Sequence, residues 1–227
     1  MSTSIITAII GVAGVIIGTL LRWWLWWRSK QREAERSRPY DKMAAAFKLG
    51  FYSVELTYLS EWKDIESVSK LFNADLKKCH SLARSIGIEF PPYQFGMEEK
   101  DLFRPLHTAI DTLNTQIGSC FKAGMHCGIA FYWRFSIAAS LKSSGRLSAN
   151  ELAMANQILN MIDDDIHEAE REFKSAGLSE KLLKPVALYL KKLRKNVLTP
   201  KDIGQSGDIM VSLINKIAGQ IEARRYM

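Results

Sequence analysis

The sequence predicts an all-α protein in which a single N-terminal transmembrane helix precedes an irregular cytoplasmic helical bundle. Three observations predict this class. Apolar residues recur at spacings of three and four along most of the chain, no segment alternates with period two, and residues 1–21 carry no charged side chain. The sequence has 14 Gly and 6 Pro among 227 residues, too few for a turn-rich β-sandwich or barrel. A charged fraction of 24% and a hydrophobic fraction of 47% exclude wholesale disorder.

The first element is an apolar run over residues 5–21, which as a helix spans about 25 Å of a hydrocarbon core of about 30 Å. It is followed by one arginine and four tryptophans, which are Arg22, Trp23, Trp24, Trp26 and Trp27. Indole rings and the stem of arginine favour the membrane–water interface. No basic residue precedes the run and bulky residues follow it, unlike a cleaved signal peptide. We therefore expect an uncleaved membrane anchor over residues 1–27.

Basic residues are concentrated directly after the apolar run. Residues 22–38 carry six Lys and Arg against two Glu, so this stretch holds four of the chain's seven net positive charges. Because an excess of Lys and Arg marks the cytoplasmic side, we expect a single-pass protein of the cell inner membrane with its N-terminus outside. Residues 28–39 then form a basic juxtamembrane linker that ends at Pro39, and residues 40–227 form a cytoplasmic helical domain.

Three glycines in the apolar run have helical spacing. Gly11, Gly14 and Gly18 are three and four residues apart, which places them on one face of the anchor. In lipid, small residues on one face allow helix backbones to approach closely, so this face predicts self-association into a homo-oligomer. The alternative is a plain tether with no packing role for the glycines.

Helical periodicity divides the cytoplasmic domain into about six helices. In chain order, we expect helices over residues 43–62 and 65–86, a loop over 88–96, a helix from 102 toward 141, and helices over 148–177, 186–197 and 200–221. Ser148 and Glu151 match a capping box, and Gly87 is a candidate C-terminal cap. Pro200, after Thr199, suits the first position of the last helix.

Residues 123–141 are the second most apolar stretch and have two interpretations. One is a second membrane segment, but Arg134 near its centre costs about 3 kcal/mol, which cancels the gain from its apolar residues. The other is a helix buried in the core of the cytoplasmic domain, which the sequence favours.

Neither the acidic residues nor the cysteines have the pattern of a catalytic or metal site. Asp163, Asp164 and Asp165 are consecutive, so they point in different directions from a helix whose apolar stripe leaves them mostly solvated. Catalysis or divalent-metal binding would need a second acidic motif, which the sequence lacks. The three cysteines lack the spacing of a zinc site and are expected to be buried and reduced, without a disulfide. We therefore expect no metal and no cofactor.

A basic patch lies near the C-terminus, where residues 181–201 hold seven positive charges. The candidate anion-binding residues in it are Lys184, Lys191, Lys192, Arg194 and Lys195. Such a patch suits the phosphates of nucleic acid, a nucleotide or anionic lipid, and its alternative is a solvated helix face. No phosphate loop, dinucleotide fingerprint, nucleophile elbow or kinase signature is present, so we expect a protein that is not an enzyme.

In its order of apolar anchor, tryptophans, basic linker and helical domain, the chain resembles the small transmembrane effectors of bacterial antiphage systems, including those of retrons. The resemblance implies an antiviral effector whose helical domain is controlled by a protein or nucleoprotein regulator. Release from the regulator would let the anchors assemble and perturb membrane lipid. The alternative is a membrane-tethered scaffold or adaptor that recruits a cytoplasmic partner.

Overall fold

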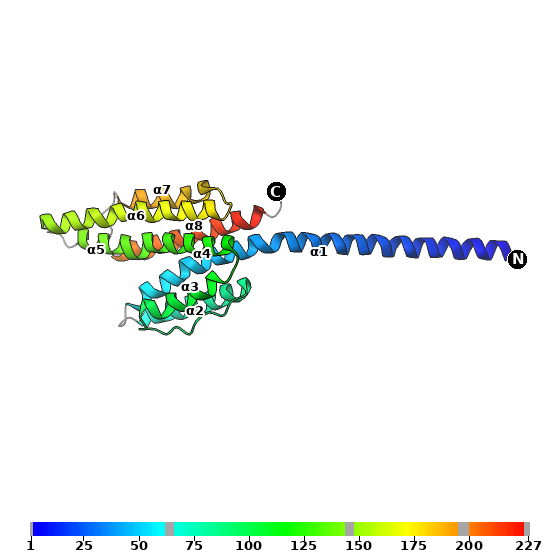
Figure 1. Ribbon diagram of the computed structural model, residues 1–227, viewed down its shortest axis with the longest axis horizontal. Helices are drawn as coiled ribbons and strands as arrows, with labels where there is room; N and C mark the ends of the chain where they lie inside the picture. The colour runs from blue at the N-terminus through cyan, green and yellow to red at the C-terminus, as the bar shows by residue number, and fades with distance from the viewer. Residues whose placement is uncertain (1, 62–65, 144–147, 195–199, 225–227) are drawn as a thin grey trace. The chain divides into compact units, whose positions relative to one another are not determined.

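The computed structural model describes the chain except for residues 1, 62–65, 144–147, 195–199 and 225–227 (Figure 1). Side chains are described outside residues 1–18, 20, 30–38, 62–67, 142–147, 195–204 and 225–227. The described residues contain helices and loops and no strand, which confirms the all-α class. The helices are α1 (Ser2–Ser60), α2 (Glu66–Ile86), α3 (Glu99–Asp111), α4 (Thr115–Gly128), the π-helix η1 (Ile129–Phe135), α5 (Ser136–Ser143), α6 (Ala149–Ser175), the 3-10 helix η2 (Glu180–Leu183), α7 (Lys184–Arg194) and α8 (Pro200–Ala223).

The chain forms two compact units, Met1–Pro39 and Tyr40–Met227. Proline at position 39 disfavours a continuous helix on sequence grounds, but α1 contains Pro39 as an internal residue. Proline removes one backbone N–H, and Pro39 is exposed, so water can bind the carbonyl that loses its partner.

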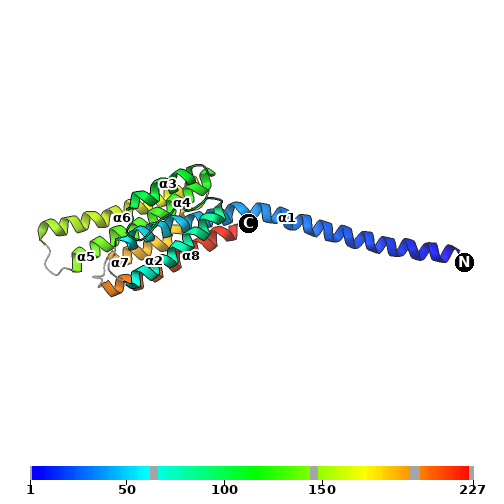
Figure 2. The same ribbon diagram turned by 90° about the horizontal axis from the view of Figure 1, so that it is seen from below.

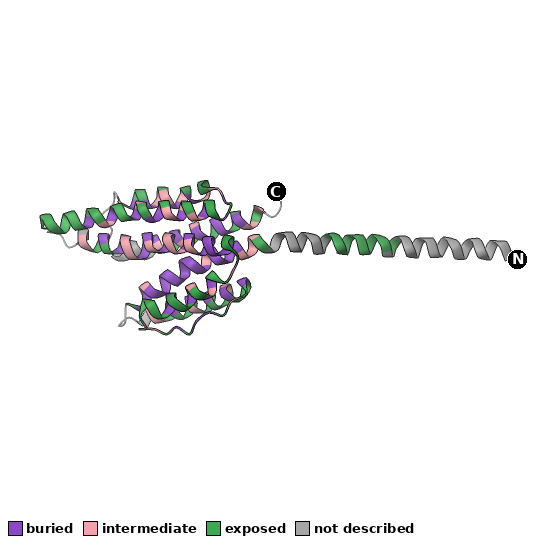
Figure 3. Cartoon of the chain, viewed as in Figure 1, coloured by how far each residue is buried: buried purple, intermediate pink, exposed green. Residues whose placement is uncertain are grey.

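The second unit is built around the end of α1. From Met43 to Ser60 every residue is buried except Lys48 and Tyr58, which are partly buried (Figure 3). A helix that is buried on all sides must be surrounded by other elements. Phe47 meets Phe173 of α6 at a ring-centroid distance of 5.3 Å. The end of α1 is therefore the central helix of the bundle.

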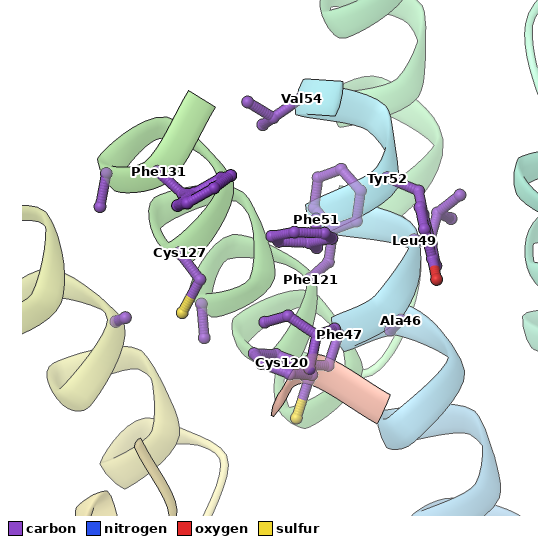
Figure 4. Packing of buried hydrophobic residues seen from close by; sticks show 14 of the residues in the cluster. Ala46, Phe47, Leu49, Phe51, Tyr52, Val54, Cys120, Phe121, Cys127 and Phe131 are labelled. Atoms are coloured by element: carbon purple, nitrogen blue, oxygen red, sulfur yellow. The ribbon is translucent and has the colours of Figure 1, made fainter. Parts of the chain in front are cut away.

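Glycines bring α1 and α4 into backbone contact. A Cβ atom added to Gly50 of α1 would lie 2.0 Å from the carbonyl oxygen of Phe121, and one added to Gly124 would lie 1.9 Å from that of Phe47. At Gly128, one turn further along, an added Cβ atom would lie 2.8 Å from the Cβ of Val54 and 3.2 Å from the carbonyl oxygen of Phe51. Around this contact, Phe47 and Phe51 of α1 pack beside Phe121 of α4 (Figure 4). The glycines that weaken α4 as an isolated helix thus permit its packing.

The segment after α1 agrees with the expected helix and loop. Helix α2 ends where Gly87 takes a φ of 92°, as expected of a C-terminal cap. The loop that follows is tied back to α1 by Ser60, whose hydroxyl donates to the carbonyl of Met97 at 3.2 Å and accepts from the N–H of Gly96 at 2.9 Å.

The single helix expected from residue 102 toward 141 is wrong, because the chain breaks after α3. Asn114 starts a new helix there, since its side chain accepts a hydrogen bond from the N–H of Gln116 and caps α4. Helix α4 then continues through the π-helix η1 into α5. The second unit therefore has more helices than the six expected, even among its described residues.

The expected boundaries agree with α6 and with the start of α8, whereas α7 begins at Lys184, directly after the unexpected 3-10 helix η2, and its expected end at residue 197 lies outside the described residues. The capping box of Ser148 and Glu151 starts α6, and Gly177 follows its end with a φ of 73°. Helix α6 lies along α4, η1 and α5 (Figures 1 and 2). Helix α8 begins at Pro200, as expected, while the expected cap Thr199 is outside the described residues.

Residues 123–141 lie in the core of the second unit. Their buried side chains include Cys127, Phe131 and Phe135, and Phe131 lies beside α1 in Figure 4. The structure thus shows the buried-helix arrangement of the two considered. Where side chains are described, none of the helices has both the length and the apolar character to cross a membrane. The anchor expected over residues 5–21 falls mainly outside that part of the chain and remains a prediction.

Candidate functional site

The first candidate site is the tryptophan collar, which we define as Trp23, Trp24, Trp26 and Trp27 of α1. All four indoles are exposed, with 61, 44, 57 and 45% of the residue accessible. Leu21 and Leu25 are also exposed, and at 100° per residue these six side chains cover the whole circumference of the helix. Arg22 is exposed beside them. The guanidinium carbon of Arg28 lies 4.9 Å from the centre of the Trp24 ring, a cation–π contact.

The exposed tryptophan collar is unfavourable in water. Apolar surface costs about 25 cal/mol per Å² when it stays hydrated, and soluble proteins rarely expose a contiguous apolar patch of this extent without a binding role. At a membrane interface the indole bodies enter the apolar phase while each N–H keeps a polar partner. The collar thus has the composition and exposure of an interfacial anchor. Gly11, Gly14 and Gly18 have helical backbones in α1, but their surroundings are outside the described side chains.

The second candidate is the basic patch, which the structure divides. Lys184, Lys191 and Lys192 are exposed on α7. Lys184 and Lys191 line a shallow cavity of about 300 Å³ together with Lys181, Glu170 and Glu180. Because two carboxylates share this cavity with three ammonium groups, its excess positive charge is small.

Arg194 has a different environment from these lysines. Its Nη1 donates to Asp163 Oδ2 of α6 at 2.7 Å, and 19% of its side chain is exposed. Its Nε and Nη2 are buried and have no hydrogen-bond partner among the described residues. The hydrogen bond from Arg194 lowers the pKa of Asp163. Arg194 therefore links α7 to α6 instead of pointing to solvent, and Lys195 is outside the described residues.

Asp165 contradicts the expectation of a solvated acidic face. This residue is 5% exposed, and its carboxylate contacts two side chains of neighbouring helices, Arg134 of η1 and His126 of α4. Oδ2 accepts from Arg134 Nε, and Oδ1 lies 3.2 Å from His126 Nδ1. This pairing explains how Arg134 fits into the apolar stretch 123–141. Asp164, by contrast, is exposed as expected.

The third candidate, missed from the sequence, is the buried acid pair, which we define as Glu55 of α1 and Asp75 of α2. Glu55 is 6% exposed and Asp75 is fully buried. Glu55 Oε1 accepts a hydrogen bond of 2.7 Å from the Tyr132 hydroxyl of η1. Asp75 Oδ1 accepts one of 2.6 Å from Lys78 Nζ, which also lies 4.8 Å from the centre of the Tyr52 ring. The other oxygens, Glu55 Oε2 and Asp75 Oδ2, are buried and have no partner among the described residues.

Burial dominates the electrostatics of the acid pair. Burial, and then the negative charge of Asp75, raise the pKa of Glu55 to about 8. Burial also raises the pKa of Asp75, although the hydrogen bond from Lys78 opposes the shift. The pKa of the Tyr132 hydroxyl is raised by burial and by the charge of Glu55. Neutral Glu55 is therefore the stable form of this side chain over much of the physiological range.

The thiols and the described acidic groups do not assemble into a metal centre. All three cysteines are free and buried, as the sequence predicts. Burial raises the pKa of Cys120 to about 12, so the described structure holds it as an unreactive thiol. Among the residues that the structure describes, no group of three or more His, Cys, Asp or Glu side chains is placed to hold a metal ion.

The chain matches no protein-family model, no curated protein and no solved structure.

Proposed function

We propose that this protein is a non-enzymatic effector of the bacterial inner membrane that acts in antiviral defence. In this proposal residues 5–21 span the membrane once, with the N-terminus outside and residues 40–227 in the cytoplasm. A protein or nucleoprotein regulator holds the helical domain. Release lets the anchors self-associate through Gly11, Gly14 and Gly18 and perturb the membrane.

The tryptophan collar is the observation that carries the proposal. Arg22 and four exposed indoles follow an uncharged run of 17 residues, and further basic residues follow the indoles. The three segments follow one another in the order that a membrane requires. Apolar side chains lie in the hydrocarbon, aromatic rings at the interface and positive charge on the cytoplasmic side. Because this surface is largely apolar and exposed, the helix is more stable in a membrane than in water.

Glycine packing elsewhere in the chain supports the self-association step. Gly124 and Gly128, spaced by four like Gly14 and Gly18, let α4 contact the backbone of α1. The same geometry between two copies of the anchor would place their backbones in direct contact, which is the favourable mode of helix association in lipid.

A second candidate function is a membrane-tethered scaffold or adaptor. Helix α6 exposes Leu152, Met154 and Met161 at 48, 53 and 38%, and unbranched methionines adapt to varied partner surfaces. The exposed lysines of α7 offer a second contact, to phosphates of nucleic acid or of a nucleoprotein regulator. In this alternative, the anchor only positions the domain at the membrane.

A membrane-potential dye distinguishes the two functions. The full chain is expressed from an inducible promoter, alone and with its genomic neighbours, beside a Gly11→Leu, Gly14→Leu, Gly18→Leu triple variant. The effector predicts depolarisation by the wild type and its loss in the triple variant at equal membrane abundance, because leucines hold the backbones apart without reducing hydrophobicity.

The control variant is Ile16→Leu, which at 100° per residue lies on the side of the helix opposite the three glycines and should depolarise like the wild type. Depolarisation by the triple variant at equal abundance would exclude packing through the glycines. A silent membrane with the wild type in every combination would favour the scaffold.

A further inference from the structure

If both acids of the buried acid pair were ionised, their negative charge would exceed the positive charge of the neighbouring groups. The titratable groups that face Glu55 come from four helices and are Tyr52 of α1, Asp75 and Lys78 of α2, Tyr132 of η1 and Asp208 of α8. Cys79 of α2 is influenced by the same carboxylates. Its thiol and both tyrosines are neutral, since burial raises the pKa of each. Two ionised carboxylates would therefore share one ammonium group, that of Lys78, whose side chain is 48% exposed.

One oxygen of each carboxylate lacks a hydrogen-bond donor in the described structure. Glu55 Oε2 and Asp75 Oδ2 are both acceptors, both buried and both without a hydrogen bond in the described structure. Each such atom costs about 1–3 kcal/mol if it stays unpaired. A single hydrogen on Glu55 Oε2 turns this unpaired acceptor into a donor, and it removes the negative charge of Glu55 that opposes the charge of Asp75.

We propose that Glu55 and Asp75 form a proton-binding site, in which one bound proton on Glu55 holds α1 against α2 and whose loss to solvent weakens that contact. In the protonated form Glu55 is neutral and keeps its hydrogen bond from Tyr132, while Lys78 continues to donate to Asp75 Oδ1. When the proton leaves, Glu55 becomes a carboxylate beside the charge of Asp75, and the two helices repel each other. The pKa of Glu55, raised to about 8, agrees with this order of events.

The π-helix η1 contributes the third element of the site. A π-helix inserts one extra residue into a helical ladder and is often found at functional positions. Here it carries Tyr132, whose hydroxyl donates to Glu55 Oε1, and Trp133, whose Nε1 donates to Thr57 of α1 at 3.3 Å. The charge state of Glu55 therefore acts at the junction of α1, α2 and η1. All of these groups belong to the unit Tyr40–Met227, so the inference does not depend on the membrane proposal.

The site is tested on the full chain in detergent by thermal unfolding between about pH 5 and pH 9. Because the folded-state pKa of Glu55 lies above its unfolded value, the folded state binds more protons, and the melting temperature should fall as the pH rises toward about 8. In Glu55→Gln this fall should be much smaller, since a neutral amide replaces the titrating group. The matched control is Glu89→Gln, an exposed glutamate, which should keep the wild-type profile.

Carbon-13 NMR of labelled glutamate provides the second measurement, which needs no variant that might alter folding. One glutamate carboxyl of the wild type should titrate well above the ordinary range, and its signal should be absent in Glu55→Gln. A spectrum in which every glutamate carboxyl titrates in the ordinary range near pH 4.3 would overturn the proposal. Parallel pH profiles of the wild type and Glu55→Gln would overturn it as well.

Discussion

The contact between α1 and α4 predicts opposite effects of the same substitution at different glycines. Gly124→Ala would place a Cβ atom 1.9 Å from the carbonyl oxygen of Phe47, and Gly50→Ala would place one 2.0 Å from that of Phe121. Ordinary contacts begin at 3.4 Å, so the two backbones would have to separate by about 1.5 Å. The obstructing atoms belong to the main chain and cannot rotate away.

The expected magnitude follows from two terms of opposite sign. Overpacking of a filled core costs about 1–3 kcal/mol, and backbone displacement belongs at the upper end of that range. Alanine favours the helix over glycine by about 1 kcal/mol. We therefore expect Gly50→Ala and Gly124→Ala each to lower the free energy of unfolding by about 2 kcal/mol.

Two other glycines serve as controls. At Gly118 the nearest atom to an added Cβ is Ile110 Cγ2 at 3.8 Å, and at Gly219 no atom lies within 4 Å. Alanine at either position should raise the free energy of unfolding by up to about 1 kcal/mol. The assay is thermal unfolding of the full chain followed by circular dichroism. If Gly124→Ala stabilises the protein as Gly118→Ala does, then α1 and α4 are not in backbone contact.

The remaining predictions concern ion pairs of α6. Asp165→Asn removes the charge that faces Arg134, so we expect a loss of about 2 kcal/mol of stability in thermal unfolding, and an unchanged melting temperature would refute the pair. Asp163→Asn replaces the charged acceptor of Arg194 by a neutral amide and so weakens this hydrogen bond, at an expected cost of about 1 kcal/mol in the same assay. Because Arg194 lowers the pKa of Asp163, this pair stabilises the fold above the ordinary carboxyl pKa and loses its effect as the pH falls through the lowered value. A wild-type and an Asp163→Asn protein with identical acid unfolding profiles would contradict that pairing.

Local signals predicted several boundaries because each depends on a few neighbouring residues. Gly87 takes the left-handed backbone that ends α2, and Ser148 with Glu151 makes the hydrogen bonds that start α6. Pro200 begins α8 because its missing N–H has no partner at a first helical position in any case. These features need no knowledge of the rest of the fold.

Features that depend on long-range packing were not predicted. Gly124 and Gly128 read as weak points of a helix, although their effect is decided by the backbone of α1, more than 70 residues earlier. The break at Asn114 interrupts an apolar period that continues on both sides. The π-helix η1 has no sequence signal that distinguishes it from an α-helix, and its side chains contact both α1 and α6 in the folded unit.

The buried charges were the main omission in the candidate sites. Asp165 lies three residues after Ile162 and four before Ala169, which are positions of the buried face. Arg134 in the apolar stretch also required a counter-charge somewhere in the fold, and together these two signals indicate the pair. Glu55 lies in a segment without a polar face, from Met43 to Ser60, which is the signal that an acidic residue there is buried. Its partner Asp75 could not be found from periodicity alone.

The central claim is that residues 5–27 hold this chain in a membrane. Alkaline carbonate extraction tests it most directly, on membranes from cells that express the full chain or a variant lacking residues 1–27. The account predicts that the full chain stays in the membrane pellet and that the shortened chain appears in the soluble fraction, because an apolar span with an interfacial collar resists extraction and the helical domain alone does not. Release of the full chain by carbonate would contradict the claim.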